Sequence, residues 1–283
     1  MTTSDMSRRR FAEAVGAFAA MVAGGAFEAT IAAAADEKAA SPPSHDMSQM
    51  PAHWRGNEKV VMLVYPGFTA LDIVGPQYMF ASMMGAKTYI VAKTKEPVRS
   101  DTGLVVMPAM DFSEAPRDVD IFCVGGGTRG TVNAMKDEET MRFVKTVGGR
   151  AKYLTSVCTG SMILGAAGLL EGYKATSHWL AKRLLPGFGA IPTDGRFVRD
   201  RNRITAGGVT AGIDFGLGLI AQLRDDRYAQ GVQLLAEYAP APPFEGDPAR
   251  APSEVREHLE AMMWRFNDEM GEEAKAAYLR SKA

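Results

Sequence analysis

The sequence predicts an α/β fold built on a doubly wound, mostly parallel sheet with helices on both faces. Two observations carry this prediction. The uninterrupted apolar run at 60–65 and the largely apolar segment at 119–124 have the pattern of strands that are buried on both faces. Helical patterns separate the successive strands along the chain. Such alternation is typical of a parallel sheet, which binds its ligands beyond the carboxyl ends of the strands.

The remaining elements follow from local patterns. Further strands are expected at 88–92, 104–107 and 152–157, and a β-hairpin at 196–199 and 203–205. Helices are expected over 71–84, 137–147, 160–168, 210–223, 226–238 and 252–280. The prolines from Pro240 to Pro243 end the helix before them, because proline has no backbone N–H to donate.

Composition excludes several classes of protein. The 283 residues are 46% hydrophobic and 23% charged, which is ordinary for a globular chain with a sizeable core. The formal net charge of −1 gives no basic surplus for binding nucleic acid. Two cysteines and four histidines are too few for a disulfide framework or a structural zinc site. We therefore expect no metal and no nucleic-acid partner.

The N-terminal segment reads as an export signal. Ser7-Arg8-Arg9-Arg10-Phe11 is followed by an uncharged stretch at 14–27 and by four alanines at 32–35, in the order of a signal peptide. The paired arginines resemble a twin-arginine signal. We expect residues 1–35 to engage the twin-arginine machinery and to be removed, leaving a periplasmic protein without membrane contact. The alternative is an amphipathic N-terminal helix with a chance arginine triplet.

The rest of the chain divides into three parts. The polar, Pro- and Ser-containing segment 36–57 is expected to be a flexible linker. Residues 58–244 carry the strand and helix patterns and form the predicted domain. Residues 245–283 form a helical extension, which packs either on the domain or on a partner subunit.

The most informative residue is Cys158. The strand at 152–157 ends directly before it, and a small-residue helix begins within two residues after it. A side chain at such a sharp strand-to-helix turn stands above the sheet, as in a nucleophile elbow. Unpaired N–H groups at the helix start are expected to lower the cysteine pKa from its usual value of about 8.5. The alternative is a small buried hydrophobic side chain, which is the expected role of Cys123.

Carboxylates are better placed than histidines to assist Cys158. Asp72 follows the first strand and therefore lies at the same edge of the sheet, where a carboxyl group beside a thiolate is suited to carry a proton. It could equally cap the following helix. His178 is the one histidine in the core of the domain, and we expect it to be structural. Asp214 is expected to be a buried hydrogen-bonding group.

Three glycines follow the strand at 119–124. Gly125-Gly126-Gly127 lacks the spacing of a dinucleotide-binding loop, and no Walker lysine follows it. A loop that brings backbone N–H groups to the cysteine is the better explanation. Gly126 and Gly127 are expected to form one half of an oxyanion hole, and the Thr159 N–H the other half.

Several motifs together resemble the ThiJ/PfpI superfamily, and more closely its isonitrile (isocyanide) hydratases. Leu71-Asp72-Ile73-Val74-Gly75-Pro76 is similar to the Asp-containing motif of that group. The other matching segments are Ser156–Ser161, Gly165–Leu170, Ala175–Trp179, Thr210–Phe215 and Glu237–Phe244. The resemblance covers about residues 58–244 and departs from the family in lacking a proline before Gly125.

The resemblance implies a flavodoxin-like homodimer that acts on a small molecule without a cofactor. It implies that Cys158 is the nucleophile, that Asp72 is the acid/base and that Thr159 lies beside them. The implied reaction is hydration of an isonitrile to an N-substituted formamide through a thioimidate.

Other branches of the superfamily fit less well. The peptidases and amidotransferases of the superfamily have a histidine directly after the cysteine, or a later His-x-Glu pair, whereas this sequence has Thr159 at the first position. The glyoxalase and chaperone branch has a glutamate in place of Asp72. AraC-type regulators with a similar cysteine segment add a DNA-binding region, whereas only a short segment follows Phe244 in this sequence. The serious alternative is a non-catalytic periplasmic protein that binds small molecules or senses redox state.

Overall fold

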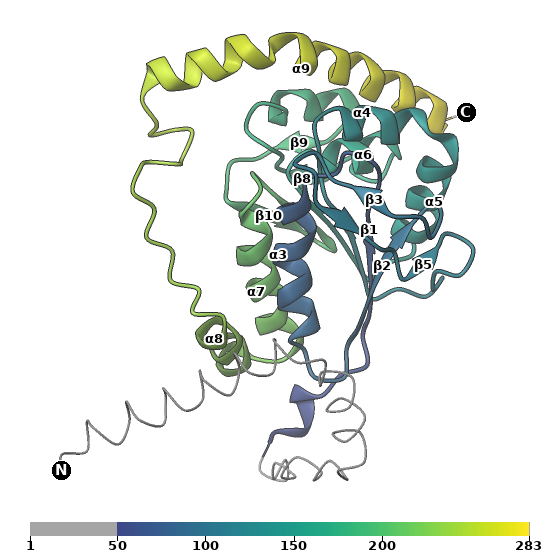
Figure 1. Cartoon of the computed structure of the whole chain (residues 1–283), viewed down its shortest axis with the longest axis vertical. Helices are drawn as coiled ribbons and strands as arrows, with labels where there is room; N and C mark the ends of the chain where they lie inside the picture. The colour runs from purple at the N-terminus through teal and green to yellow at the C-terminus, as the bar shows by residue number, and fades with distance from the viewer. Residues whose placement is uncertain (1–49, 283) are drawn as a thin grey trace, which may run out of the picture. The chain divides into compact units, whose positions relative to one another are not determined.

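The computed structural model describes residues 50–282; the predicted signal at 1–35 and the linker up to residue 49 lie outside this range. A seven-stranded sheet has the order β10-β11-β7-β6-β1-β2-β5, and all neighbours are parallel except the hairpin β10-β11 (Figure 1). The predicted fold class is confirmed. The strands are β1 (Lys59–Leu63), β2 (Lys87–Ala92), β5 (Met110–Asp111), β6 (Ile121–Val124), β7 (Tyr153–Val157), β10 (Phe197–Asp200) and β11 (Arg203–Ala206).

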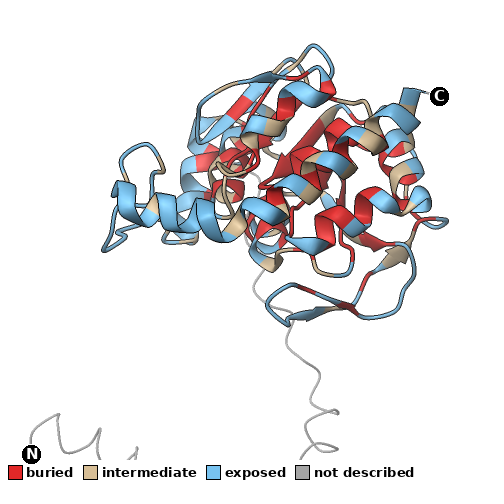
Figure 2. Ribbon diagram, turned by 90° about the horizontal axis from the view of Figure 1, so that it is seen from above, coloured by how far each residue is buried: buried red, intermediate tan, exposed pale blue. Residues whose placement is uncertain are grey.

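The strands at the centre of the sheet consist of uninterrupted apolar residues. Every residue from Val60 to Leu63 in β1, and from Ile121 to Val124 in β6, is fully buried. Figure 2 shows the buried residues concentrated on the strands and on the helix sides that face them. A parallel strand covered on both faces needs apolar side chains in both directions, which explains the continuous runs.

On one face of the sheet, α3 (Ala70–Ala81) and α7 (Ala211–Leu223) lie side by side, and α8 (Asp226–Leu235) packs on α7 (Figure 1). Small residues permit this close approach. A Cβ added to Gly212 would lie 2.9 Å from Pro76 Cδ, and one added to Gly216 would lie 2.9 Å from Met79 Cβ. The glycine spacing of α7 therefore sets how closely α3 packs against it.

The other face is covered by shorter helices and by the C-terminal helix. These elements are α4 (Arg129–Lys136), α5 (Glu138–Gly148), α6 (Gly160–Ala166), the 3-10 helix η2 (Lys182–Phe188) and α9 (Ser253–Lys282). The α9 helix packs on α4, α6 and η2. No helix of the described residues is long and apolar enough to cross a membrane.

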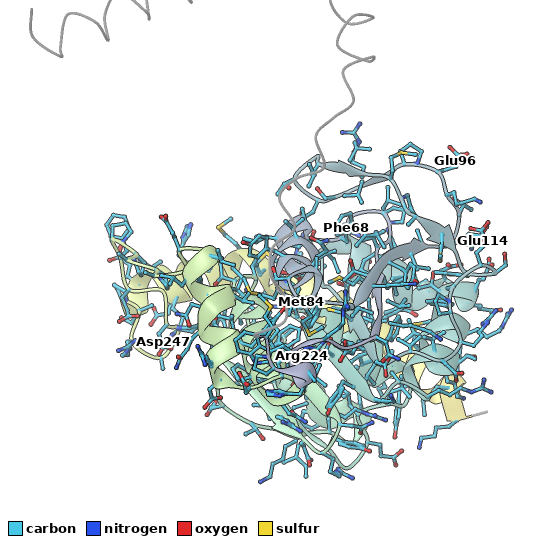
Figure 3. All side chains as sticks on the ribbon, turned by 90° about the horizontal axis from the view of Figure 1, so that it is seen from below. Phe68, Met84, Glu96, Glu114, Arg224 and Asp247 are labelled. Carbon is cyan, nitrogen blue, oxygen red and sulfur yellow. The ribbon has the colours of Figure 1, made fainter. Side chains whose placement is uncertain are left out.

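Residues 52–57, which we expected in the linker, are held against the domain. They include a short 3-10 helix, η1 (Ala52–Trp54). The buried Arg224 guanidinium donates to the Trp54 carbonyl oxygen at 2.6 Å and pairs with Glu58 at 2.6 and 2.7 Å. Arg224 also donates to the Met84 carbonyl oxygen at 3.3 Å, and Figure 3 shows the two residues next to each other.

Sequence patterns missed the shorter elements. The helix α4 was not expected, because it is brief and contains a glycine. The two-residue strands β3 (Val98–Arg99), β4 (Val105–Val106), β8 (Lys174–Ala175) and β9 (Ile191–Pro192) form two small separate sheets. Of these, only β4 overlaps an expected strand.

Candidate active site

Cys158 lies at the turn between β7 and α6, and its φ of 57° is in the left-handed region. A non-glycine residue there costs roughly 1–2 kcal/mol, so the surroundings must hold it. The Cys158 N–H donates to the carbonyl oxygens of Ala206 and Gly207 at 3.1 and 2.8 Å. The Cys158 carbonyl oxygen accepts from the Ser177 hydroxyl at 3.1 Å. These bonds fix the strained turn at the carboxyl end of the sheet.

Asp72 is fully buried in the first turn of α3. Its Oδ2 accepts a 2.7 Å hydrogen bond from the Gly126 N–H, while its Oδ1 has no hydrogen-bond partner among the described residues. Burial raises the pKa of Asp72 to about 7, although the Gly126 N–H and the neighbouring Cys158 thiol oppose the rise. Asp72 lies three residues after the N-cap position, Thr69, so it is not the helix cap.

The expected low pKa of Cys158 is wrong. Burial, followed by the charge of Asp72, raises the pKa of the Cys158 thiol well above its usual value. The backbone N–H and the side chain of Thr159 act in the opposite direction and are outweighed. The sulfur is desolvated because the Cys158 residue is only 7% exposed. The two groups therefore influence each other's titration, and near neutral pH the thiol keeps its proton while the Asp72 carboxyl is partly ionised.

The glycine loop approaches Cys158 as expected, but its N–H groups are already used. Gly126 donates to Asp72, and the Gly127 N–H donates to Thr159 Oγ1 at 3.0 Å. A Cβ on Gly126 would lie 2.5 Å from the Thr159 nitrogen, so only glycine permits this approach. The structure thus replaces the predicted oxyanion role of Gly126 and Gly127 with a positioning role.

A buried chain of hydroxyl groups supports Thr159, and sequence patterns do not predict most of it. Thr159 Oγ1 and Thr131 Oγ1 are 2.8 Å apart, and the Tyr65 hydroxyl lies 3.3 Å from Thr131 Oγ1. Tyr65 also donates to the Gly125 carbonyl oxygen at 2.8 Å. Tyr65 could have been found as a polar group at the end of a buried strand. Thr131 lies in α4, which sequence patterns missed.

His178 and Asp214 are not part of the Cys158–Asp72 pair. His178 lies in the loop before η2, where burial lowers its pKa, and its Nδ1 accepts from the Leu180 N–H at 3.4 Å. Asp214 was expected to be buried, but its side chain is 27% exposed. It accepts hydrogen bonds from Arg196 at 2.7 Å and from Tyr238 at 3.0 Å. Asp214 therefore anchors the segment after α8.

The described residues contain no group of three or more His, Cys, Asp or Glu side chains that could hold a metal ion. The chemistry available at this turn is that of one thiol and one carboxyl group. Both are removed from water and held by backbone hydrogen bonds.

Comparison with known proteins places the chain in a family. Residues 58–222 match the model of the DJ-1/PfpI family. The isonitrile hydratase of Pseudomonas putida is 48% identical over 198 residues, which are 70% of this chain and 86% of that protein. The transcriptional regulator GbdR of Pseudomonas aeruginosa is 30% identical over 61% of this chain, which spans only 48% of that protein.

Solved structures of similar proteins support the same family. The crystal structure of a ThiJ/PfpI family protein from Pseudomonas syringae is 52% identical and superposes with a TM-score of 0.78, covering 84% of this chain and 98% of that one. DJ-1 of Toxoplasma gondii is 22% identical with a TM-score of 0.56, covering 65% of this chain and all of that one, a likeness of fold alone. The buried cysteine turn, the sheet order and these matches together show that the chain belongs to the DJ-1/PfpI family.

Proposed function

We propose that the protein hydrates isonitriles to N-substituted formamides, with Cys158 as nucleophile and Asp72 as acid and base. The observation that carries this proposal is the buried thiol–carboxyl pair, in which Asp72 has a pKa of about 7. Such a carboxyl group both donates and accepts protons near neutral pH. The similarity to an isonitrile hydratase at 48% identity supports the same chemistry.

The first step is addition of the cysteine to the terminal carbon of the isonitrile. A proton moves from the thiol to Asp72, the sulfur forms a bond to the carbon, and Asp72 returns the proton to that carbon. The product is a thioimidate, and its C–H hydrogen is the former thiol hydrogen. A strongly basic thiolate is also a strong nucleophile, so a raised cysteine pKa favours this step once Asp72 has taken the proton.

The second step is hydrolysis of the thioimidate. Asp72 removes a proton from water as the oxygen adds to the carbon, and it passes this proton to the nitrogen. The C–S bond then breaks, the remaining hydroxyl proton passes through Asp72 to the sulfur, and the formamide is released. Isonitrile and water are consumed, and both side chains return to their starting state.

The burial of Cys158 weighs against the redox-sensing alternative. Sensor cysteines are accessible and have a low pKa, whereas Cys158 is 7% exposed and has a raised pKa. A protein that only binds a small molecule is the remaining competitor. Such a protein would keep its ligand affinity after Cys158→Ala, and its unsubstituted form would show no turnover.

The test is formation of the formamide from an alkyl isonitrile, followed by mass spectrometry. The parent should form product, while Cys158→Ala and Asp72→Asn should not. Cys123→Ala is the matched control because Cys123 is also a buried cysteine but lies within β6. Folded parent protein that forms no product from any of several alkyl isonitriles would contradict the proposal.

We also propose that residues 1–35 direct export to the periplasm through the twin-arginine machinery. Replacing Arg8 and Arg9 by lysine should retain the full-length chain in the cytoplasm of a bacterial host. Cell fractionation and the mass of the exported chain measure this. Export that is unchanged by the double substitution would contradict the proposal.

A further inference from the structure

A cavity of about 450 Å³ lies at the carboxyl edge of the sheet, apart from the thiol–carboxyl pair. It is enclosed by the ends of β1 and β2, by the loop 93–98 after β2, and by the helices α4 and α5. Doubly wound sheets bind their ligands at this edge. The described residues that line the cavity include neither Cys158 nor Asp72 nor Thr159, so it is a site distinct from the candidate active site.

The inner wall of the cavity is apolar. It is formed by Val64, Tyr65, Ala92, Val98 and Ala134, all of which are buried. A cavity of about 150 Å³ with such a lining holds a benzene molecule. The larger volume here has room for an aromatic ring together with a short alkyl chain.

Most charged groups of the lining are engaged within the protein. The Lys93 ammonium lies 2.7 Å from Asp137 Oδ1 and 3.2 Å from Glu139 Oε2. Asp137 Oδ2 accepts a 2.6 Å hydrogen bond from the Thr140 hydroxyl. Lys93 is therefore already neutralised and is a poor partner for an anionic ligand.

Glu96 is the exception among the charged groups of the lining. Within residues 50–282 its carboxylate has no cationic partner, because the neighbouring Lys95 pairs with Glu114 at 2.6 Å. Figure 3 shows Glu96 at the outer edge of the domain. With one lysine against Glu96 and Asp137, the lining carries an excess of one negative charge.

We infer that this cavity binds a small apolar primary amine, with its hydrocarbon body against the inner wall and its ammonium group on Glu96. The charge of the lining favours a cation over a carboxylate or a phosphate. An ammonium group has three hydrogens to donate, and the side-chain oxygens of Glu96 and Asn133 accept them at the mouth of the cavity. This inference does not depend on the proposed hydratase activity.

The cavity shares its wall with the support of the active site. The Tyr65 side chain lines it, and the Tyr65 hydroxyl donates to the Gly125 carbonyl oxygen at 2.8 Å. The helix α4 contributes Asn133 and Ala134 to the wall and also carries Thr131, which contacts Thr159. A bound amine therefore packs against the tyrosine and the helix that hold the glycine loop and Thr159 in place.

The test is isothermal titration calorimetry of the full-length chain at neutral pH with 2-phenylethylamine, 2-phenylethanol and phenylacetate. We expect one amine to bind per chain with a dissociation constant of about 1 mM or lower, the alcohol to bind more weakly, and phenylacetate not to bind. Glu96→Gln should weaken binding of the amine by about fivefold and leave binding of the alcohol unchanged. Ala134→Leu narrows the cavity and should weaken binding of both by about tenfold or more.

Glu138→Gln is the matched control, because Glu138 is an exposed carboxylate on α5 that does not line the cavity, and it should leave the amine affinity unchanged. Asp72→Asn should also leave it unchanged. Circular dichroism checks the fold of each variant, and Glu96→Gln decides the matter if Ala134→Leu does not fold.

The inference is overturned if the parent binds no amine or binds phenylacetate as tightly as the amine. It is equally overturned if Glu96→Gln binds the amine as tightly as Glu138→Gln does. Loss of amine binding in Asp72→Asn would place the amine in the active site instead.

Discussion

Replacing Asp72 by asparagine should make the protein more stable at alkaline pH while it removes the proposed activity. The Asp72 carboxyl is fully buried and its pKa is raised from 3.8 to about 7. The unfolded chain loses this proton near pH 4, but the folded chain keeps it until about pH 7. The unfolded state thus binds fewer protons in this window, so stability falls as pH rises through it.

The size of the effect follows from the shift. About three pKa units at 1.36 kcal/mol each correspond to a loss of about 4 kcal/mol, complete above pH 7 and absent below pH 4. Asparagine has no charge to desolvate, and its side-chain oxygen still accepts from the Gly126 N–H. Between pH 5 and pH 8 the stability of Asp72→Asn relative to the parent should therefore rise by about 3 kcal/mol.

Denaturant unfolding of both proteins at pH 5 and pH 8 measures this difference. Asp118→Asn is the control, because Asp118 is exposed, and it should show no such change. The reasoning is refuted if the gain from Asp72→Asn is the same at both pH values, or if the variant is the less stable protein at pH 8.

Three further predictions concern the surroundings of the pair. Gly126→Ala should destabilise by about 1–3 kcal/mol and reduce activity, since its Cβ would lie 2.5 Å from the Thr159 nitrogen. Gly231 lies in a helix with open space around it, so Gly231→Ala should instead stabilise the protein by about 0.5–1 kcal/mol. Thermal unfolding compares the two variants. Equal changes in stability would contradict the predicted clash at Gly126. Thr131→Val should remove the 2.8 Å hydroxyl contact to Thr159, lower the rate of turnover by about tenfold and destabilise the fold by about 1–3 kcal/mol. An unchanged rate would show that the chain of hydroxyls is not needed. Iodoacetamide at pH 7 should alkylate Cys158 more slowly than a free cysteine, because burial raises its pKa; faster alkylation, read by mass spectrometry, would contradict this.

Much of the fold could be predicted because its signals are local. The continuous apolar runs of β1 and β6 predict buried parallel strands without reference to the rest of the chain. The hairpin at β10-β11 follows from its turn residues, and the cysteine turn follows from a strand that ends directly before a helix. The family resemblance rests on short motifs such as Ser156–Ser161 at the cysteine turn, and membership of the family is confirmed by the match over residues 58–222.

The sequence by itself determined which residues meet at the carboxyl edge of the sheet: Cys158, Asp72, Thr159 and the glycine loop. Tertiary structure decided what they do there. The pKa of Cys158 is raised rather than lowered because desolvation sums the contributions of many distant residues, whereas the helix start acts only locally. The N–H groups of Gly126 and Gly127 donate to Asp72 and Thr159, which are distant in sequence. Such hydrogen bonds form only when the chain is packed, so local sequence patterns do not predict them.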